Sequence, residues 1–470
     1  MIAIAPEIFV GSMACIVLLV GAFSKNQYNP ITYILSLLTL SIALMLTFAT
    51  MPITANTLYA NSFIVDRFAH SFKIILYLLL VGIFVYSRNY TYERKFFQGE
   101  FFALSLFSLL GMMVLISSAN FLTLYLGLEL FVLPIYAMIV LVKEQSKYIE
   151  AAIKYFIIGS LGSGLLLYGI SLIYGGVGTI SFAAIANTTT PNLLLLQLGM
   201  IFVVVGITLE FGAVPFHMWL PDVYEGSPTT VTMIISTIPK LAVFAAAYRL
   251  LTLAFVNLNS SWQEIFLVLA IISVFLGNFM AIAQTNIKRM LAYSTISHIA
   301  FILLAMFVAP TAGFQPAIFY TIVYAFMALA AFAVIIYMTN VGFEADLISD
   351  FRGLNQRAPW LAFIMLLIMF SLAGVPPLVG FYAKLQVLQA VVNSGYSWLA
   401  VLALLASVIG AFYYLRVVRE MYFVAPQQNS TIDANMSVVG KILLSGHGLA
   451  LLIFGIYPAM MVYWCLTMLQ

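Results

Sequence analysis

Five charged side chains stand inside, or at the edge of, long apolar stretches of a chain that is only 7% charged. They are Glu129, Lys154, Glu210, Lys240 and Lys384. One charged side chain at the centre of a membrane-spanning helix costs about 2.5–3.5 kcal/mol on insertion scales. Because five such residues carry a large combined cost, we interpret them as functional groups.

Glutamate and lysine in an apolar setting are suited to proton relay. Burial disfavours the charged form of each side chain and a neighbouring opposite charge favours it, so movement of a nearby charge can switch the protonation state. Lys240 follows Pro239 in the string STIPKLAVF and stands well inside its apolar stretch. A row of alternating Glu and Lys bridged by water can therefore pass protons. Snorkelling of the ammonium to a headgroup layer is the alternative, which stays open for Lys154 and Lys384.

Two of the four histidines are further candidates, because histidine titrates near neutrality. His298 belongs to a polar patch in the string YSTISH, and His217 begins the string HMWLPD. A lone histidine among apolar residues can equally be a hydrogen-bonded core residue, and for both positions that alternative stays open. His70 and His447 are expected to have no functional role.

The composition is that of an integral membrane protein. The chain has 470 residues, of which 64% are hydrophobic, and its mean hydropathy is +1.10. A net charge of +3 is too small to indicate nucleic-acid binding. Cys15 and Cys465 form no metal-ligand or disulfide pattern, and no nucleotide-binding motif is visible. We therefore expect the chain itself to bind no redox cofactor, nucleotide or metal.

Fourteen apolar runs are long enough to cross a bilayer as helices, which takes about 20 residues. The expected spans are 2–22, 31–51, 72–88, 101–118, 120–142, 150–174, 194–217, 228–253, 263–284, 292–309, 315–340, 359–388, 398–424 and 442–466. A transmembrane barrel would need short segments of alternating polarity, whereas these runs are continuous. The predicted fold is an all-α integral membrane domain over 1–470.

Lys and Arg residues are concentrated in alternate loops. Thirteen of the nineteen fall after odd-numbered spans and only three after even-numbered ones. The thirteen are Lys25, Arg88, Arg94, Lys95, Lys143, Lys147, Lys288, Arg289, Arg352, Arg357, Arg416, Arg419 and Lys441. Because cytoplasmic loops carry the excess of positive charge, both termini are expected on the non-cytoplasmic side, and a bacterial inner membrane is the expected location.

Two spans contain a comparable break at proline. Pro215 interrupts the seventh span and Pro376 the twelfth. Proline removes a backbone donor, and the freed carbonyls are tolerated in a membrane only where protein or water satisfies them. Breaks in corresponding positions suggest two related five-helix repeats, 101–253 and 263–424, with spans 1–3 peripheral and 442–466 as the last span. The alternative is that Pro and Gly are simply common in membrane helices.

Three strings resemble the signature regions of a known family. They are VPFHMWLPDVYEGSPTTV (214–231), NIKRMLAYSTISHIAF (286–301) and SLAGVPPLVGFYAKL (371–385). The family comprises the proton-translocating membrane subunits of complex I and is related to Mrp-type cation/proton antiporters. The APEI string at 5–8, the DFRGL string at 350–354 and the number of spans resemble one branch of it, subunit N.

The resemblance implies roles residue by residue. Glu129 matches the family's glutamate of span five, and Lys154 the lysine that pairs with it. Lys240 matches the central lysine of span eight, and Lys384 the terminal lysine of the broken span twelve. A connecting polar axis would contain Lys288 and His298, and the helix-breaking prolines would be Pro215 and Pro376.

Glu210 departs from the family pattern, which usually has lysine five residues before the span-seven proline. A sibling subunit has glutamate at the equivalent site of span twelve, so a carboxyl group there is chemically workable. With Glu210, the charge of Lys154 would favour the ionised carboxylate and that of Glu129 the protonated form.

The resemblance further implies a subunit of an NADH:quinone oxidoreductase that relays protons while electron transfer occurs elsewhere. NADH, FMN, iron–sulfur clusters and quinone would then belong to the other membrane and peripheral subunits, which are the expected partners together with the lipid bilayer. Two alternatives stay open: a subunit of a Na⁺ or K⁺/proton antiporter, and a structural spacer between pump modules.

Overall fold

The computed structural model is almost entirely helical. It describes residues 2–24, 30–94, 99–142, 145–189, 192–339, 343–426 and 437–469. Lys25, Lys95 and Lys143 from the charge count lie outside these residues. Within them, the membrane-type helices follow the apolar runs predicted from the sequence, so the all-α membrane fold is confirmed.

The first half of the chain forms helices that precede the first break. They are α1 (Ala5–Phe23), α2 (Pro30–Ala49), α3 (Arg67–Glu93), α4 (Gly99–Ile116), α5 (Phe121–Ile139), α6 (Ser146–Val177), α7 (Phe182–Ala186) and α8 (Leu193–Phe211). Two short strands, β1 (Asn56–Leu58) and β2 (Phe63–Val65), pair antiparallel between α2 and α3.

The second half continues with shorter connecting helices between long ones. They are α9 (Trp219–Gly226), α10 (Thr229–Arg249), α11 (Asn259–Ile282), α12 (Ile287–Phe307), α13 (Ala309–Ala312), α14 (Gln315–Met338), α15 (Leu354–Arg357), α16 (Pro359–Ala373), α17 (Val379–Asn393), α18 (Ser397–Phe423), α19 (Val438–Ile456) and α20 (Ala459–Met468). Short 3₁₀ or π turns occur at Ile2–Ile4, Leu250–Ala254, Val256–Leu258 and Ile348–Phe351.

Thirteen helices of the described chain, rather than fourteen, are long and apolar enough to cross a membrane individually. The predicted twelfth span, 359–388, is divided into α16 and α17, neither of which reaches spanning length alone. The predicted seventh span also ends early, because α8 stops at Phe211 instead of reaching 217. The relationship between the two five-helix repeats stays a prediction.

Three helices form the centre of the bundle. α10 and α12 are buried along their whole length and α14 almost so. α10 packs against α3, α4 and α14, and α12 packs against α11, α9 and α14. In the outer helices α1, α6 and α19 only 28% of the apolar window is buried, as expected for helices that face lipid or partner proteins.

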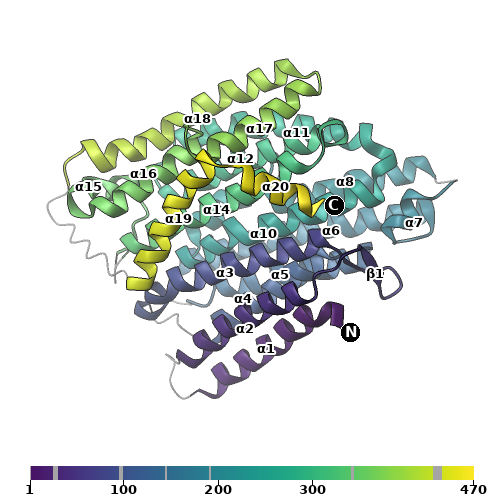
Figure 1. Ribbon diagram of the computed structural model, residues 1–470, viewed down its shortest axis with the longest axis horizontal. Coiled ribbons are helices and arrows are strands. Elements are labelled where there is room, and N and C mark those ends of the chain that lie inside the picture. Colours follow the sequence, from purple (N-terminus) through teal and green to yellow (C-terminus); the bar gives the residue numbers. More distant parts are fainter. Residues whose placement is uncertain are drawn as a thin grey trace.

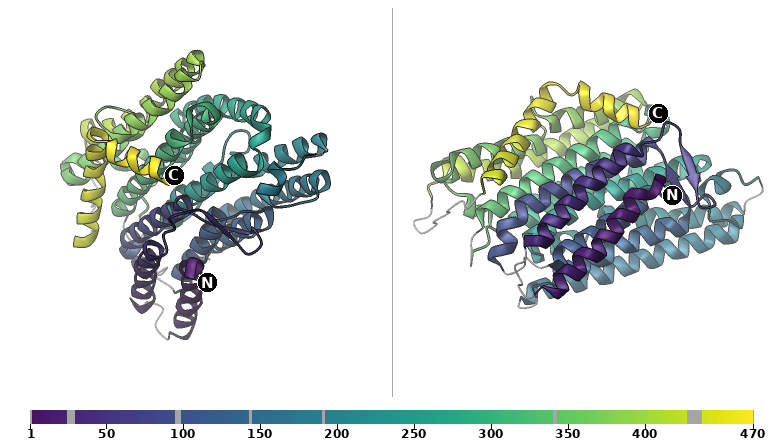
Figure 2. Two further views of the ribbon diagram at one scale, coloured as in Figure 1. Left: turned by 45° about the vertical axis from the view of Figure 1, so that its right-hand side comes forward. Right: turned by 60° about the horizontal axis from the view of Figure 1, so that its bottom comes forward.

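The two ends of the bundle differ. Both termini lie at the same end as the β-hairpin and α7, whereas α15 lies at the opposite end (Figure 1). The views in Figure 2 agree on the placement of the termini. The end with α15 contains Arg94, Lys147, Lys288 and Arg352, and we call it the basic end.

Candidate functional site

The first break in the helix bundle is a left-handed glycine at the end of α8. Gly212 has φ +80°, a conformation that glycine adopts without the penalty a Cβ would bring. Its N–H donates to the carbonyls of Thr208 (3.1 Å) and Leu209 (2.9 Å), and the N–H of Ala213 donates to Thr208 (3.1 Å). This is the Schellman pattern that ends many helices. It leaves the last carbonyls of α8 in need of other donors.

Lys240 supplies donors to that helix end. Its Nζ donates to the backbone carbonyls of Glu210 at 2.7 Å and Phe211 at 3.0 Å, and the side chain is only 1% exposed. The indole of Trp219 donates to the carbonyl of Leu209 at 3.0 Å, and its ring lies 5.0 Å from Nζ. A cation at the C-terminus of a helix is also favoured by the helix dipole. Lys240 therefore both caps α8 and presents a buried charge.

Glu210 lies beside this ammonium. The residue is 5% exposed, and the charged groups that act on its carboxyl are Lys240 and Glu129. No carboxylate of a described residue lies within ion-pair distance of Lys240, so the two groups interact through space rather than in direct contact. Glu129 on α5 is half-buried, and Ser163 of α6 donates to its Oε1 at 2.5 Å. Glu129, Glu210 and Lys240 thus form one electrostatic group.

Lys154 does not belong to that group. The side chain is 42% exposed, and its Nζ lies 2.8 Å from Asp222 and 2.8 Å from Glu150. The expected pair with Glu129 is not formed, because the carboxylates within reach are Asp222 on α9 and Glu150 on α6 itself. Lys154 is also not among the charged groups that act on Glu210. Snorkelling toward the basic end describes this lysine well.

Asp222 has a larger role than its sequence position indicates. It accepts from Lys154 and from Arg289 (2.7 Å), so it joins α6 to α12 through α9. Partial burial acts to raise the pKa of the Asp222 carboxyl, but hydrogen bonds from Lys154 and Arg289 hold it below its usual value. The sequence signal that could have found it is the acidic position one turn into α9, facing basic positions on two other helices.

The second break repeats the backbone geometry of the first. Gly374 has φ +86°, its N–H donates to Phe370 and Ser371 at 3.0 Å each, and the N–H of Val375 donates to Phe370 at 2.9 Å. Counting from the left-handed glycine, the residue equivalent to Pro215 is Pro377. The expected match with Pro376 is therefore displaced by one residue, because the sequence alone offers two adjacent prolines.

Lys384 caps the end of α16 at this break. Its Nζ donates to the carbonyl of Ala373 at 3.0 Å and to the hydroxyl of Ser407 at 2.8 Å. The ring of Phe301 lies 5.5 Å from Nζ. Like Lys240, Lys384 makes no ion pair with a described acidic residue, but Glu210 acts on Lys240 through space and no carboxyl group acts on Lys384 in this way.

His298 is fully engaged in a network of hydroxyl groups. Its Nδ1 lies 2.8 Å from the hydroxyl of Tyr320 and its Nε2 3.1 Å from that of Tyr414. Tyr414 in turn contacts Ser294 at 2.5 Å. Lys384 is the charged group that acts on His298, which connects this network to the second break. The tyrosines come from α14 and α18, and no sequence pattern pairs them with α12.

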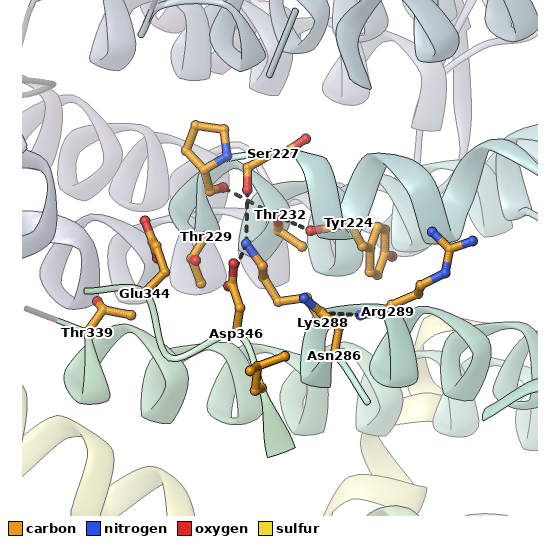
Figure 3. Close-up of polar contacts among 12 residues, drawn as sticks. Tyr224, Ser227, Thr229, Thr232, Asn286, Lys288, Arg289, Thr339, Glu344 and Asp346 are labelled. Carbon is orange, nitrogen blue, oxygen red and sulfur yellow. Dashed lines mark hydrogen bonds and ion pairs between the residues drawn. The ribbon is translucent and has the colours of Figure 1, made fainter. Parts of the chain in front are cut away.

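Lys288 and His217 lie apart from both breaks. Lys288 is 1% exposed, and its Nζ lies 3.0 Å from Asp346 and 3.3 Å from the carbonyl of Ser227 at the basic end (Figure 3). His217 lies in the linker between α8 and α9, where partial burial lowers its pKa. Neither contacts the Lys240 or Lys384 ammonium through a described hydrogen bond. Within the described residues, no group of three or more His, Cys, Asp and Glu side chains is placed to hold a metal ion.

Known proteins match the chain over nearly its full length. The family model described as NADH:quinone oxidoreductase/Mrp antiporter matches residues 118–410. A protein of Nitrosomonas europaea named NADH-quinone oxidoreductase subunit N is 46% identical over 468 residues, which cover 99% of this chain and 97% of that protein. A protein of the same name from Thiobacillus denitrificans is 47% identical over 466 residues, or 98% and 95% of the two chains.

Solved structures share the fold. A chain of respiratory complex I from Thermus thermophilus with bound aureothin superposes with a TM-score of 0.84 at 28% identity, covering 97% of this chain and 98% of that one. A chain of the Mrp complex from a Dietzia species has a TM-score of 0.88 at 19% identity, covering 99% and 96%, and shows the fold alone. These matches confirm the resemblance that the sequence strings indicated.

Proposed function

The chain belongs to the NADH:quinone oxidoreductase/Mrp antiporter family, and we propose that it moves protons across the membrane as a subunit of an NADH:quinone oxidoreductase. The subunit is an integral membrane protein whose own part is proton translocation. Electron transfer, with NADH, FMN, iron–sulfur clusters and quinone, takes place in the other membrane and peripheral subunits of the complex. The subunit lies in a bacterial inner membrane, with the basic end toward the cytoplasm and both termini on the other side.

The observation that carries this proposal is the way both buried lysines are held. An ammonium has three N–H donors and a neutral amine has two. Lys240 uses two donors on the carbonyls of Glu210 and Phe211, and Lys384 uses two on Ala373 and Ser407. Each lysine can therefore release its third proton and keep both hydrogen bonds. The helix ends stay capped while the site loads and unloads.

The relay runs through the groups that lie around the two breaks. Glu129, Glu210 and Lys240 exchange charge at the first break. His298 and its tyrosines connect toward Lys384 at the second. Water must bridge the remaining gaps, because proton transfer needs continuous hydrogen bonds. Lys154 and Lys288 pair with carboxylates at the basic end. They therefore act at the margin of the relay.

The experiment is a Lys240→Ala substitution in the assembled complex. We expect coupled proton pumping to fall by about tenfold or more, while the amount of assembled complex is unchanged. Pumping is measured as acidification of inverted membrane vesicles on addition of NADH, next to NADH oxidation with an artificial acceptor. Full pumping by a normally assembled variant would rule out the relay.

Because the fold is like that of an Mrp subunit, a second candidate function stays open. The chain would then be a subunit of an antiporter that exchanges protons for Na⁺ or K⁺. The Dietzia structure supports the architecture but not the activity. Purification of the complex that contains the chain separates the two candidates. Co-purifying flavin and iron–sulfur subunits support the oxidoreductase, whereas small membrane antiporter subunits support cation exchange.

Glu210 keeps the spacer alternative open for the first half of the chain. Glu210→Lys restores the residue that the family usually has at this position. If the substitution leaves the pumping stoichiometry unchanged, the spacer interpretation stays open for the first half of the chain. A change in stoichiometry supports a working first site.

A further inference from the structure

Two acidic residues on the segment between α14 and α16 close the basic end of the bundle. Glu344 and Asp346 lie two residues apart on a described, non-helical stretch. The backbone of this stretch is anchored on the α11–α12 connection, since the N–H of Ile287 donates to the carbonyl of Asp346 at 2.7 Å. Anchored in this way, the stretch holds both carboxylates over the helix ends.

Each carboxylate is held by cations from other helices. Arg94, at the end of α3, forms an ion pair with Glu344. Asp346 lies 3.0 Å from the Nζ of Lys288 on α12 and 3.6 Å from that of Lys147 on α6. Both carboxylates are only partly exposed, at 16% and 18%. Cations from three helices thus face the two carboxylates at the edge of the bundle.

Polar atoms around these carboxylates lack partners. Within the described residues, Glu344 Oε2 and the hydroxyls of Ser227 and Thr229 have no hydrogen-bond partner, and Asp346 Oδ1 has only the Lys288 ion pair. Ser227 and Thr229 are fully buried. In Figure 3, Thr229 lies between Glu344 and Asp346. Buried hydroxyls without partners are rare and are commonly satisfied by internal water.

The hydroxyl of Tyr90 joins these groups. It donates to Glu344 Oε1 at 3.0 Å and accepts from the backbone N–H of Thr229 at 3.2 Å. Tyr90 also lines a cavity of about 10 Å³ between α3 and α14, together with Glu93 and Thr339. That volume suits about one water molecule. The Tyr90 hydroxyl therefore connects Glu344 with the buried start of α10, and the same residue lines the water-sized cavity.

From the two carboxylates, helix α12 runs inward from Lys288 to His298. Lys288 and His298 lie ten residues apart on α12, which corresponds to about 15 Å along the helix axis. Thr295 lies between them on the same face of the helix, since seven residues are close to two turns. The hydroxyl of Tyr224 lies beside Thr295 and Tyr324, yet makes no hydrogen bond of good geometry with a described residue. The Tyr324 hydroxyl donates to Thr295 at 2.8 Å, and the Tyr324 ring lies 5.3 Å from that of His298, so these hydroxyls lie beside the histidine network.

We propose that Glu344 and Asp346 form a proton-uptake site at the basic end, in which water held over Thr229 passes protons inward past Lys288 and Tyr224 to His298. The proposal rests on the proposed function and adds to it the mouth of the path. A carboxylate takes a proton from bulk water and becomes a carboxyl. The carboxyl becomes a carboxylate again when that proton moves to the water above Thr229. This water then releases a proton to the next acceptor.

Water access is tested without any pumping measurement. Thr229→Cys is introduced into the complex with Cys15 and Cys465 replaced by alanine, and a small hydrophilic methanethiosulfonate is added to inverted vesicles, which expose the cytoplasmic face. Labelling of this chain is followed by mass spectrometry. The matched control is Thr237→Cys on the same helix, which is equally buried but whose native hydroxyl donates to Met233 at 2.7 Å.

We expect the thiol of the Thr229→Cys variant to react about tenfold faster than that of the Thr237→Cys variant, because only a hydrated thiol forms its reactive thiolate readily. The reaction should occur in inverted vesicles and not in right-side-out ones. Equal rates in the two variants, or reaction from the opposite side only, overturn the uptake site. Either result leaves the Lys240 experiment unaffected, so the two proposals fail independently.

The carboxylates are tested by Glu344→Gln combined with Asp346→Asn. We expect coupled pumping to fall by about tenfold with normal assembly, and Asp346→Glu alone to retain it, because that change keeps the carboxylate. The control is Asp350→Asn on the same stretch, whose carboxylate accepts from the N–H of Leu347 and takes no part in the uptake site. Full pumping by the double variant overturns the proposal, as does an equal loss in Asp346→Glu, which would indicate a purely structural role.

Discussion

The two helix breaks have the same backbone geometry but differ in the charged side chains around them. Both end in a left-handed glycine with the same three hydrogen bonds, and both expose carbonyls that a lysine caps. At the first break the lysine comes from the neighbouring helix α10 and lies beside Glu210. At the second it comes from α17, the continuation of the broken span itself. The position equivalent to Glu210, counted from the glycine, is Leu372.

This difference separates two tasks that the breaks could perform. At the first break, the through-space pair of Glu210 and Lys240 can exchange charge internally, so its protonation responds to events in neighbouring helices. Lys384 has no acidic neighbour among the described residues, and its proton must leave through Ser407, His298 or water. The shared backbone geometry presents the carbonyls that each lysine caps. The neighbouring side chains determine how the protonation state of each lysine changes.

Replacing each lysine by methionine should produce the largest difference between the breaks. Lys240→Met leaves two buried carbonyls without donors, at about 1–3 kcal/mol each, and removes the central proton carrier. We expect pumping to fall by about 100-fold, against about tenfold for Lys384→Met, because Lys384 is less deeply buried than Lys240. NADH-driven acidification of inverted vesicles measures both variants. Lys441→Met, at an exposed position on α19, is the control, and equal losses at the two breaks would contradict the comparison.

Glu210→Leu gives the first break the apolar neighbour that the second already has. We expect about a tenfold loss of pumping with unchanged assembly, because Lys240 keeps its backbone acceptors and loses only its charge partner. Vesicle acidification at matched complex content measures the effect. Glu210→Gln tests the charge with the shape retained. If the glutamine variant pumps normally, the carboxylate is not needed and the two breaks are functionally alike.

Smaller changes at the helix caps should act on one break only. Trp219→Phe removes the donor to Leu209, and Ser407→Ala removes the side-chain acceptor of Lys384. Each loss is about 1 kcal/mol, which corresponds to about fivefold faster local amide exchange. Hydrogen–deuterium exchange should rise near Gly212 in the first variant and near Gly374 in the second. Crossed effects would show that the breaks are mechanically coupled.

The smallest effect is expected at Asp222, which anchors α9 after the first break and has no counterpart after the second. Because the pKa of Asp222 is lowered, its stabilisation is fully present above the unfolded-state value of about 3.9 and is lost as the pH falls through the lower folded-state value. Asp222→Asn should therefore lower stability by about 0.5–1 kcal/mol at neutral pH, and by progressively less as the pH falls through the folded-state pKa. Denaturation of the purified complex across this range measures the difference; a constant difference would exclude ionisation as its source.

Much of the molecule follows from its sequence. The spans are visible because a continuous apolar run has few alternatives to crossing a membrane as a helix. Glu129, Glu210, Lys240 and Lys384 stand out because a charge in such a run is costly whatever surrounds it. The breaks are visible at Pro215 and Pro376 because proline acts on its own backbone, whereas the left-handed glycines Gly212 and Gly374 that end the helices are seen only in the structure.

Partner choice follows only from the packed helices. Lys154 binds Asp222 instead of Glu129, Lys240 binds the carbonyls of α8, and His298 binds tyrosines from α14 and α18. The sequence by itself determined which groups are charged, which segments are apolar enough to cross and where proline interrupts them, because these depend on single residues and their immediate neighbours. Tertiary structure alone decided which groups meet, because a hydrogen bond depends on distances between helices that hydropathy does not specify.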